Sequence, residues 1–482
     1  MKIAQLKSVS EFRKRLDELK LELLVDDQIL TEAEGSPLAE AIQIGRHDVA
    51  NRWVIHPMEG WDANSDGSPS PHTLRRWRKF GESGAKLIWG GEAAAVQPDG
   101  RANPHQTLAT PSNQQGLAAL RDELIAGHLD VCETADDLLV GLQLTHSGRF
   151  CRPHSKQLEP RIAYHHPLLD EKFQIHPGDD SVVWTDDDLQ RLIDNYVVAA
   201  GLAYQTGYQF VDIKACHGSL LHEFLSARSR PGPFGGDFSG RTKLLTSIIE
   251  AVHSQYPDLS IVVRLSVFDT LPYQSGRDVG RPMKWDPDQP YVFGFGVDPG
   301  DPSQMDLAEP IRLIQHLQQR GVVAVNISCG SPYYNPHVQR PAVFPPSDGY
   351  APPEDPLVGV VRQIQAAKIC KLAVPGLPMV GTGYSYLQDY LPHVAQAVVR
   401  AGWIDLVGLG RMVLSYPDLP MDTLKRGEMR RKKVCRTFSD CTTAPRNGLL
   451  SGCFPLDPYY KRMEAAKQLR GLKTMEKPPS DD

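Results

Sequence analysis

The chain has 482 residues, of which 41% are hydrophobic and 23% charged, a composition typical of globular proteins. Its formal net charge of −6 comes without a long basic block, which argues against nucleic acid or an anionic membrane as partner. No apolar stretch approaches the roughly 18 residues that span a bilayer. Eight cysteines without a secretory signal are typical of reduced thiols in a cytoplasm. We expect a cytoplasmic protein that acts on a small molecule; its homo-oligomeric state stays open.

The first 24 residues carry charges every few positions and no apolar core, so they do not have the pattern of a signal peptide. Four apolar residues recur there at helical spacing, behind Ser10 as the expected cap: Phe12, Leu16, Leu19 and Leu23. We therefore expect residues 1–45 to form a helical extension that docks on the rest of the chain.

Eight short apolar runs alternate with amphipathic stretches along the chain. The runs are residues 52–57, 85–93, 138–146, 210–215, 260–266, 322–328, 377–383 and 404–411. The helical patterns between them include residues 185–207, 239–255, 306–321 and 355–370, of which the first starts at Thr185. Eight strand–helix repeats favour an α/β fold of the (β/α)8 TIM barrel type over residues 46–425. An open α/β sheet is the alternative.

Two segments do not fit the repeat. Residues 266–305 are rich in Pro, Gly and aromatics and follow the fifth strand, where a barrel places loops of its catalytic face, so we expect a lid. Residues 426–482 form a C-terminal extension, and its polar end, residues 473–482, is expected to be disordered.

Glycines follow the seventh and eighth predicted strands. Gly381 and Gly383 flank a threonine after the seventh, and Gly410 precedes Arg411 after the eighth. Glycines let backbone N–H groups approach a phosphate, and an arginine adds a fixed positive fork. The pattern favours a phosphate site at the place where barrels most often hold one. Tight strand–helix turns that need glycine are the alternative.

Arg264 lies on the fifth predicted strand, where a buried cation needs a partner. Either a buried carboxylate or an anionic ligand can balance it. A phosphate at the late strands, with Arg264 and the Gln143 amide nearby, outlines a cofactor with a phosphate at one end. Its other end is a hydrogen-bonding ring that gains negative charge. Reduced flavin mononucleotide (FMN) fits both ends.

Several motifs resemble the old yellow enzyme family of flavin oxidoreductases, over roughly residues 45–425. "NRWVIHPM" (51–58) resembles the family's first strand, and "GLQLTHSGR" (141–149) resembles its third. "FVDIKACHGSLLHEFLSARSR" (210–230) resembles the segment that carries a substrate-binding histidine, and "MVGTG" and "DLVGLGRM" complete the order. The resemblance implies a (β/α)8 barrel that binds FMN and takes electrons from NAD(P)H.

The resemblance also implies roles for individual residues. Those expected around the flavin ring are Pro57, Met58, Ala93, Gln143 and Arg264, and those expected at the phosphate are Gly381, Gly383, Gly410 and Arg411. His217 is expected to hydrogen-bond an oxygen of the substrate stacked on the flavin.

The chain departs from the family pattern after the fourth strand. The family pair His-x-x-His or His-x-x-Asn is replaced here by Lys214 and His217, and a lysine cation favours a substrate oxygen that is already anionic or gains charge. The alternative is that Lys214 turns aside to a carboxylate such as Asp212 or Glu92. Ser219 stands where a tyrosine commonly supplies a proton, and an aliphatic hydroxyl is a poorer donor.

Three further residues bear on the chemistry. Tyr333 or Tyr334, after the sixth strand, could replace the missing proton donor, unless both are packing aromatics. Glu59 stands beside the expected flavin position, where a carboxylate makes the flavin harder to reduce, unless the backbone points it away.

Cys435, Cys441 and Cys453 resemble part of the [4Fe–4S] ligand pattern of larger family members similar to 2,4-dienoyl-CoA reductase. The second cysteine of that pattern is Phe438 here, and the third is one residue out of place. A cluster normally takes four thiolates. We expect no metal, and a segment that packs as ordinary structure.

The expected function is FMN-dependent transfer of hydride between NAD(P)H and an organic substrate with a partly anionic oxygen, by default the reduction of an activated C=C bond. Oxidative dehydrogenation or demethylation of a small substrate is the alternative within that class. A non-redox enzyme that uses Lys214 on a phosphorylated substrate, and a flavin-binding protein without turnover, remain outside it.

Overall fold

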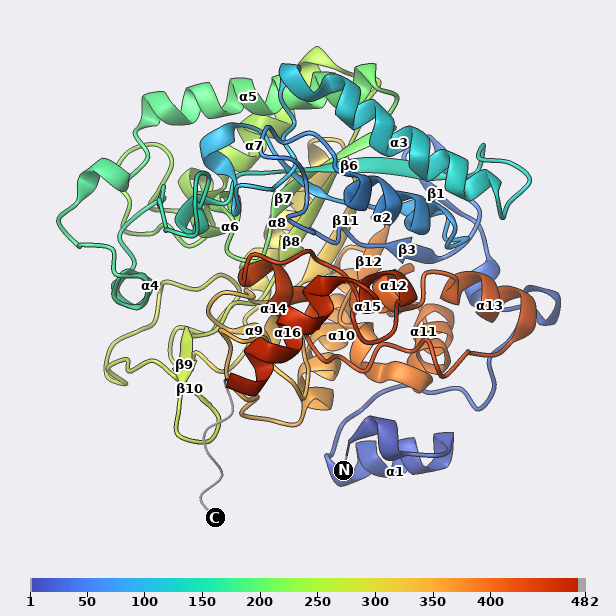
Figure 1. Cartoon of the computed structure of the whole chain (residues 1–482). Helices are drawn as coiled ribbons and strands as arrows, with labels where there is room; N and C mark the ends of the chain where they lie inside the picture. Colours follow the sequence, from blue (N-terminus) through green and yellow to red (C-terminus); the bar gives the residue numbers. More distant parts are fainter. Residues whose placement is uncertain (1, 476–482) are drawn as a thin grey trace.

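The computed structural model describes residues 2–475 and shows a closed barrel of parallel strands (Figure 1). Its strands are β3 (Trp53–Ile55), β4 (Leu87–Ile88), β6 (Leu139–Thr145), β7 (Phe210–Ala215), β8 (Ser260–Ser266), β11 (Val322–Ser328), β12 (Met379–Gly381) and β13 (Leu406–Leu409). The last strand pairs with the first, with Gly408 opposite Val54, and β4 pairs with β6. All eight predicted strands are present, so the predicted barrel is confirmed and the open sheet is excluded.

Helices surround the strands, as the sequence pattern predicts. They are α2 (Pro71–Gly81), α3 (Gln114–Leu129), α5 (Asp186–Gln205), α7 (Phe238–Gln255), α8 (Ala308–Gln319), α10 (Pro356–Ala373) and α11 (Leu391–Arg400). Thr185 caps α5, because its side chain accepts a hydrogen bond from the backbone N–H of Asp188. Shorter helices follow individual strands: α4 (Pro167–Phe173), α6 (Leu220–Phe224), α9 (Pro336–Gln339), α12 (Arg411–Ser415) and α13 (Leu419–Arg426).

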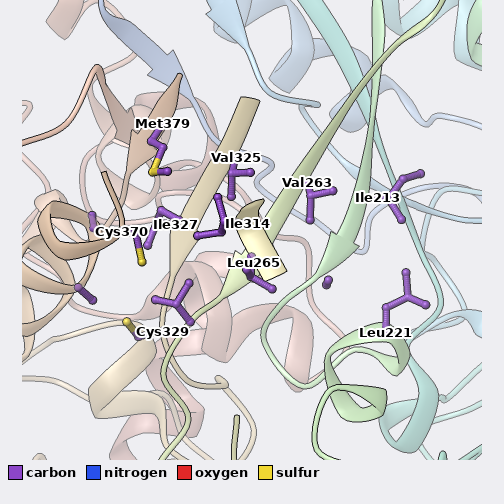
Figure 2. Packing of buried hydrophobic residues seen from close by; sticks show 14 of the residues in the cluster. Ile213, Leu221, Val263, Leu265, Ile314, Val325, Ile327, Cys329, Cys370 and Met379 are labelled. Carbon is purple, nitrogen blue, oxygen red and sulfur yellow. The ribbon is translucent and has the colours of Figure 1, made fainter. Parts of the chain in front are cut away.

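Strand alternation sorts the side chains of the barrel into two cores. Val263 and Leu265 of β8 and Val325 and Ile327 of β11 pack outward in the same core as Ile314 of α8 (Figure 2). A second core fills one end of the barrel interior, and the antiparallel hairpin of β1 (Ile42–Ile44) and β2 (His47–Val49) packs into it. Because successive residues point to opposite faces, the residues between the outward-facing ones point into the barrel.

The predicted docking helix is α1 (Val9–Glu18). Its cap is Ser8, whose hydroxyl accepts a hydrogen bond from the Glu11 backbone N–H at 3.1 Å; the expected cap, Ser10, lies in the first turn instead. Phe12 is fully buried and stacks on Tyr390 with 4.4 Å between ring centroids. The extension is therefore fixed to the barrel by an aromatic pair.

The two segments outside the strand–helix repeat, residues 266–305 and 426–482, contain short elements of their own. Residues 266–305 contain an antiparallel hairpin of β9 (Tyr273–Ser275) and β10 (Gly280–Pro282). The C-terminal extension forms α14 (Asp440–Arg446), α15 (Pro458–Lys461) and α16 (Glu464–Met475), drawn in red in Figure 1. Because α16 reaches Met475, the first part of the expected disordered tail is helical, and residues 476–482 lie outside the described part of the chain. Between residues 2 and 475 no helix has the length and apolar character needed to cross a membrane.

Candidate functional site

The carboxyl ends of the strands carry a layer of polar side chains inside the barrel. Lys214 of β7 is in register with Arg264 of β8, and Arg264 is in register with Asn326 of β11. These residues alternate with Ile213, Val263 and other outward-facing apolar residues, which is why they point inward. Lys214 and Arg264 line one cavity, which we call the central cavity.

The wall of the central cavity is strongly cationic. Five of its residues are basic and one is a carboxylate, Glu59; the basic ones are Lys214, Arg264, Arg340, Arg411 and Arg446. Three buried guanidinium nitrogens in this wall have no hydrogen-bond partner within the described chain: Arg264 Nε, Arg340 Nε and Arg411 Nη1. Burial of unpaired donors and charges costs free energy, so the wall is suited to an anionic ligand.

Arg264 does not pair with the carboxylate next to it. Asp212 accepts hydrogen bonds from Gln143 Nε2 at 2.6 Å, Trp89 Nε1 at 2.8 Å and the Arg264 backbone N–H at 2.7 Å. Burial nevertheless raises the pKa of Asp212 to about 6 and lowers that of Arg264. Within residues 2–475 no carboxylate lies at ion-pair distance from the Arg264 guanidinium, which leaves the anionic ligand as the partner that the sequence argument allowed.

At the late strands, the backbone and one guanidinium face the same cavity. Gly383 lines it in a left-handed conformation with φ of 92°, which favours glycine. A Cβ at Gly410 would meet only Met58 Sδ, at 3.8 Å, so this backbone is open to a ligand. Arg411 donates through Nη2 to the Pro341 carbonyl at 2.8 Å and leaves Nη1 unpaired. Gly381 lies in β12 and is not part of the wall.

Lys214 and His217 both face the central cavity. Lys214 Nζ lies 3.7 Å from Glu59 Oε2, so its carboxylate partner is neither Asp212 nor Glu92; the latter pairs with Arg76. His217 Nε2 lies 2.7 Å from the Ser328 hydroxyl. Burial and the charges of Arg264 and Lys214 hold the pKa of His217 well below its usual value, so the imidazole is neutral near pH 7.

The candidate proton donors fall in different places. Tyr333 lines the central cavity and stacks on Phe150 at 4.0 Å, and burial raises the pKa of its phenol. Tyr334 lies outside the wall and donates to Asp269 Oδ2 at 2.7 Å, which identifies it as a packing aromatic. Ser219 also lies outside the wall, where its hydroxyl donates to the Lys214 carbonyl at 3.2 Å.

The structure thus brings most of the predicted site residues together. The cavity wall contains Pro57, Met58, Glu59, Gln143, Lys214, His217, Arg264, Tyr333, Gly383, Gly410 and Arg411, and leaves out Ala93, Ser219, Tyr334 and Gly381. Ala93 lies in β5 (Ala93–Ala95), opposite Gln143 in the sheet, where its carbonyl accepts a hydrogen bond from Gln106.

The wall also contains residues that sequence reasoning missed. His56 lies within the first predicted strand, where no role was expected for it, Gln339 and Arg340 follow the sixth, and Cys441, Thr442 and Arg446 come from α14. Arg340 Nη1 donates a hydrogen bond to the Thr442 hydroxyl, which ties α14 to the cavity. The cysteine segment therefore does more than pack as ordinary structure. Residues 266–305 contribute nothing to this wall, and their role as a lid stays a prediction.

The cysteine segment places its three thiols near one another. Burial raises the thiol pKa of Cys435 and Cys453, and neighbouring thiols raise both further. Within the described residues no group of three or more His, Cys, Asp or Glu side chains is arranged to hold a metal ion.

Comparison with known proteins decides the family. Residues 37–282 match the sequence profile of the NADH:flavin oxidoreductase / NADH oxidase family. The chain belongs to this family. Membership places it among FMN-dependent NAD(P)H oxidoreductases related to old yellow enzyme.

Individual relatives are distant. An NADH:flavin oxidoreductase of Gibberella zeae is 24% identical over 68% of this chain and 71% of its own length. An NADPH dehydrogenase of Bacillus velezensis is 28% identical over 46% of this chain and 61% of its own length. The solved old yellow enzyme homologue from Zymomonas mobilis superposes with a TM-score of 0.55 at 19% identity, over 83% of this chain and 96% of its own, and confirms the fold.

The residues of the central cavity fit FMN at both ends. Gly383, Gly410 and the unpaired Nη1 of Arg411 suit a phosphate, and the unpaired Nε of Arg264 suits a ring that gains negative charge. Gln143 lines the same cavity as Arg264, although its amide nitrogen already donates to Asp212. One ligand with negative charge at two places would therefore give a partner to the unpaired donors of Arg264 and Arg411.

Proposed function

We propose that the chain passes hydride between NAD(P)H and an organic substrate with a partly anionic oxygen, by default reducing an activated C=C bond, with FMN in the central cavity. The observation that carries the proposal is the cationic wall, where Arg264 and Arg411 each keep a buried N–H that has no partner among the described residues. FMN supplies the hydride carrier when it is bound. The family assignment and the relatives named as NAD(P)H-dependent enzymes support this choice of donor.

Two groups of residues hold the cofactor in this proposal. Gly383, Gly410 and Arg411 hold the phosphate, with the two glycine backbones close to it and the guanidinium as counter-charge. Arg264 stabilises negative charge on the ring, since no carboxylate of residues 2–475 lies at ion-pair distance from its guanidinium. Pro57 and Met58 add apolar surface at the same wall.

His217 and Lys214 hold the substrate oxygen. The neutral imidazole of His217 offers one N–H donor, and the Lys214 ammonium offers three. Preorganised donors of this kind stabilise an oxygen more strongly as its negative charge grows in the transition state. Glu59 at 3.7 Å keeps Lys214 in place and partly offsets its charge. Because a salt bridge engages Lys214, its use as a free amine nucleophile in a non-redox enzyme has less support.

One observation favours the oxidative alternative. Ser219 faces away from the cavity, and burial together with Glu59 raises the pKa of Tyr333, so neither is a ready proton donor. The neutral imidazole of His217 can instead accept a proton from a substrate that loses hydride. Dehydrogenation of a small substrate is therefore the second candidate, on the same residues.

The test is an absorption spectrum of the purified protein, then anaerobic addition of NADH and of NADPH. A flavin band near ~450 nm that bleaches supports the reductive proposal and names the donor. A band that neither nicotinamide bleaches supports the oxidative alternative or a protein without turnover. A colourless protein that does not bind added FMN contradicts the proposal.

A further inference from the structure

A second hollow adjoins the central cavity, and we call it the outer cavity. The two share wall residues, among them Trp61, Tyr333 and Arg446. The outer cavity is built by segments far apart in sequence, including Arg152, Lys172 of α4 and Asp348. A molecule in the central cavity that extends past the shared residues therefore enters the outer one.

Basic side chains dominate the outer cavity. Arg152, Lys156, Lys172 and Arg446 line it, against the single carboxylate of Asp348. Asp348 pairs with Arg446. Between residues 2 and 475, the other three have no carboxylate at ion-pair distance. Three uncompensated cations around one hollow attract an anion by the summed field and give it donors to bind.

Hydrogen bonds to backbone carbonyls keep Lys172 and Arg446 at the hollow. Lys172 Nζ donates to the Tyr273 carbonyl at 3.0 Å, and Arg446 Nη2 donates to the Pro332 carbonyl at 3.3 Å. Lys156 reaches the loop just after α14, where a Cβ at Gly448 would lie 3.3 Å from its Nζ. The cations thus come from three segments, namely the loop that holds Arg152 and Lys156, helix α4 and helix α14, and they line one hollow.

Two aromatic residues form the boundary between the cavities. Trp61 has a left-handed backbone with φ of 49°, and its buried indole N–H has no hydrogen-bond partner within the described chain. Tyr333 is fixed by its stacking on Phe150 at 4.0 Å. Flat aromatic walls and one free donor suit the middle of an elongated molecule with an anion at its far end.

We propose that the outer cavity binds an anionic group, carboxylate or phosphate, at the far end of the molecule that reacts in the central cavity. This inference rests on the proposed function, because it names the class of molecule that the redox site takes. The anion belongs either to the acceptor or to the nicotinamide donor, since both meet the flavin from the same cavity. The subsite is defined by its affinity for a carboxylate or phosphate, whichever of the two molecules carries that group.

The test compares a double variant, Lys156→Ala with Lys172→Met, with wild type and with a matched control, Lys14→Ala. Lys14 is an exposed lysine of α1 without an ion pair in the described chain. Steady-state kcat/KM is measured for 4-carboxycinnamaldehyde and its methyl ester, and for NADPH and NADH. Calorimetric titration of the FMN-loaded protein with pyrophosphate gives a readout that needs no turnover.

The double variant is expected to lower the carboxylate-to-ester ratio of kcat/KM, or the NADPH-to-NADH ratio, by about tenfold. The first outcome assigns the anion to the acceptor and the second assigns it to the donor. Pyrophosphate affinity is expected to fall by a similar factor, whereas Lys14→Ala changes neither ratio. Unchanged ratios with unchanged pyrophosphate affinity overturn the subsite. If pyrophosphate binding falls but the wild-type protein shows no turnover, the subsite stands and the proposed redox function fails.

Discussion

Replacement of Arg411 by methionine should change two quantities differently: the affinity for FMN and the stability of the FMN-free protein. Nη1 of the guanidinium is buried without a hydrogen-bond partner in residues 2–475, while Nη2 donates to the Pro341 carbonyl. A hydrogen bond to a charged group contributes about 1.5–3 kcal/mol, so Arg411→Met is expected to weaken FMN binding about 10- to 150-fold. The free energy of unfolding of the FMN-free protein should change little, because removal of a buried charge offsets the lost hydrogen bond to the Pro341 carbonyl.

Two measurements check this expectation. FMN titration gives Kd, and chemical unfolding with and without FMN gives the stabilisation by ligand. At a concentration of 100 times the wild-type Kd, FMN stabilises wild type by about 2.7 kcal/mol, and a 30-fold weaker variant by about 0.9 kcal/mol. Arg411→Lys, which keeps the charge but lacks the fork, should fall between them. A Kd for Arg411→Met within threefold of wild type would refute the phosphate role.

Three further outcomes follow from contacts described above. Lys214→Met should lower kcat/KM for acceptors about 10- to 100-fold, because it removes a hydrogen-bond donor to the substrate oxygen and the salt-bridge partner of Glu59. The variant should slow oxidation of the reduced enzyme by the acceptor more than reduction of the enzyme by NAD(P)H. Equal effects on both steps in stopped-flow traces would contradict this. Burial raises the pKa of Asp269 to about 6 from 3.8. The folded protein therefore holds a carboxyl proton that the unfolded chain releases between pH 4 and 6, and the free energy of unfolding should fall by on the order of 3 kcal/mol over this range. Asp269→Asn should remove that part of the pH dependence in urea unfolding, and parallel slopes for both proteins would count against it. Phe12→Ala should lower the free energy of unfolding by about 3–5 kcal/mol, because Phe12 is buried on Tyr390; a loss below about 1 kcal/mol would show that the extension is not anchored there.

The barrel could be predicted because its strands are short apolar runs separated by amphipathic helices. The same alternation located Lys214 and Arg264 on the inner face, since each stands between outward-facing apolar residues. Ser219 escaped this reasoning. His217 and Gly218 both adopt left-handed conformations, with φ of 64° and 81°, and turn the chain so that Ser219 precedes α6 with its hydroxyl on the Lys214 carbonyl. A residue count from the histidine does not reveal such a turn.

The site residues that lie in loops and in α14 could not be predicted, because neither strand nor helix periodicity applies to them. Arg340 and Arg446 lie in connections and in α14, which follow no strand or helix period that can be read from the sequence. Tyr333 and Tyr334 are neighbours with similar sequence context, yet one faces the cavity and the other bonds Asp269. Only the three-dimensional course of the loop distinguishes them. Long-range packing, not local pattern, decided these positions.

The contact between Arg340 and Thr442 joins α14 to the central cavity only after the barrel strands have been made. The last barrel strand must pair with the first before the barrel closes, and α14 comes later still in the chain. During synthesis a ribosome releases the segment with α14 after all eight strands, so the barrel can close before α14 completes the wall of the central cavity. The newly made barrel has to tolerate its unpaired guanidinium groups until the cavity wall is complete. The part of the wall that α14 contributes is therefore the last part of the central cavity to be made.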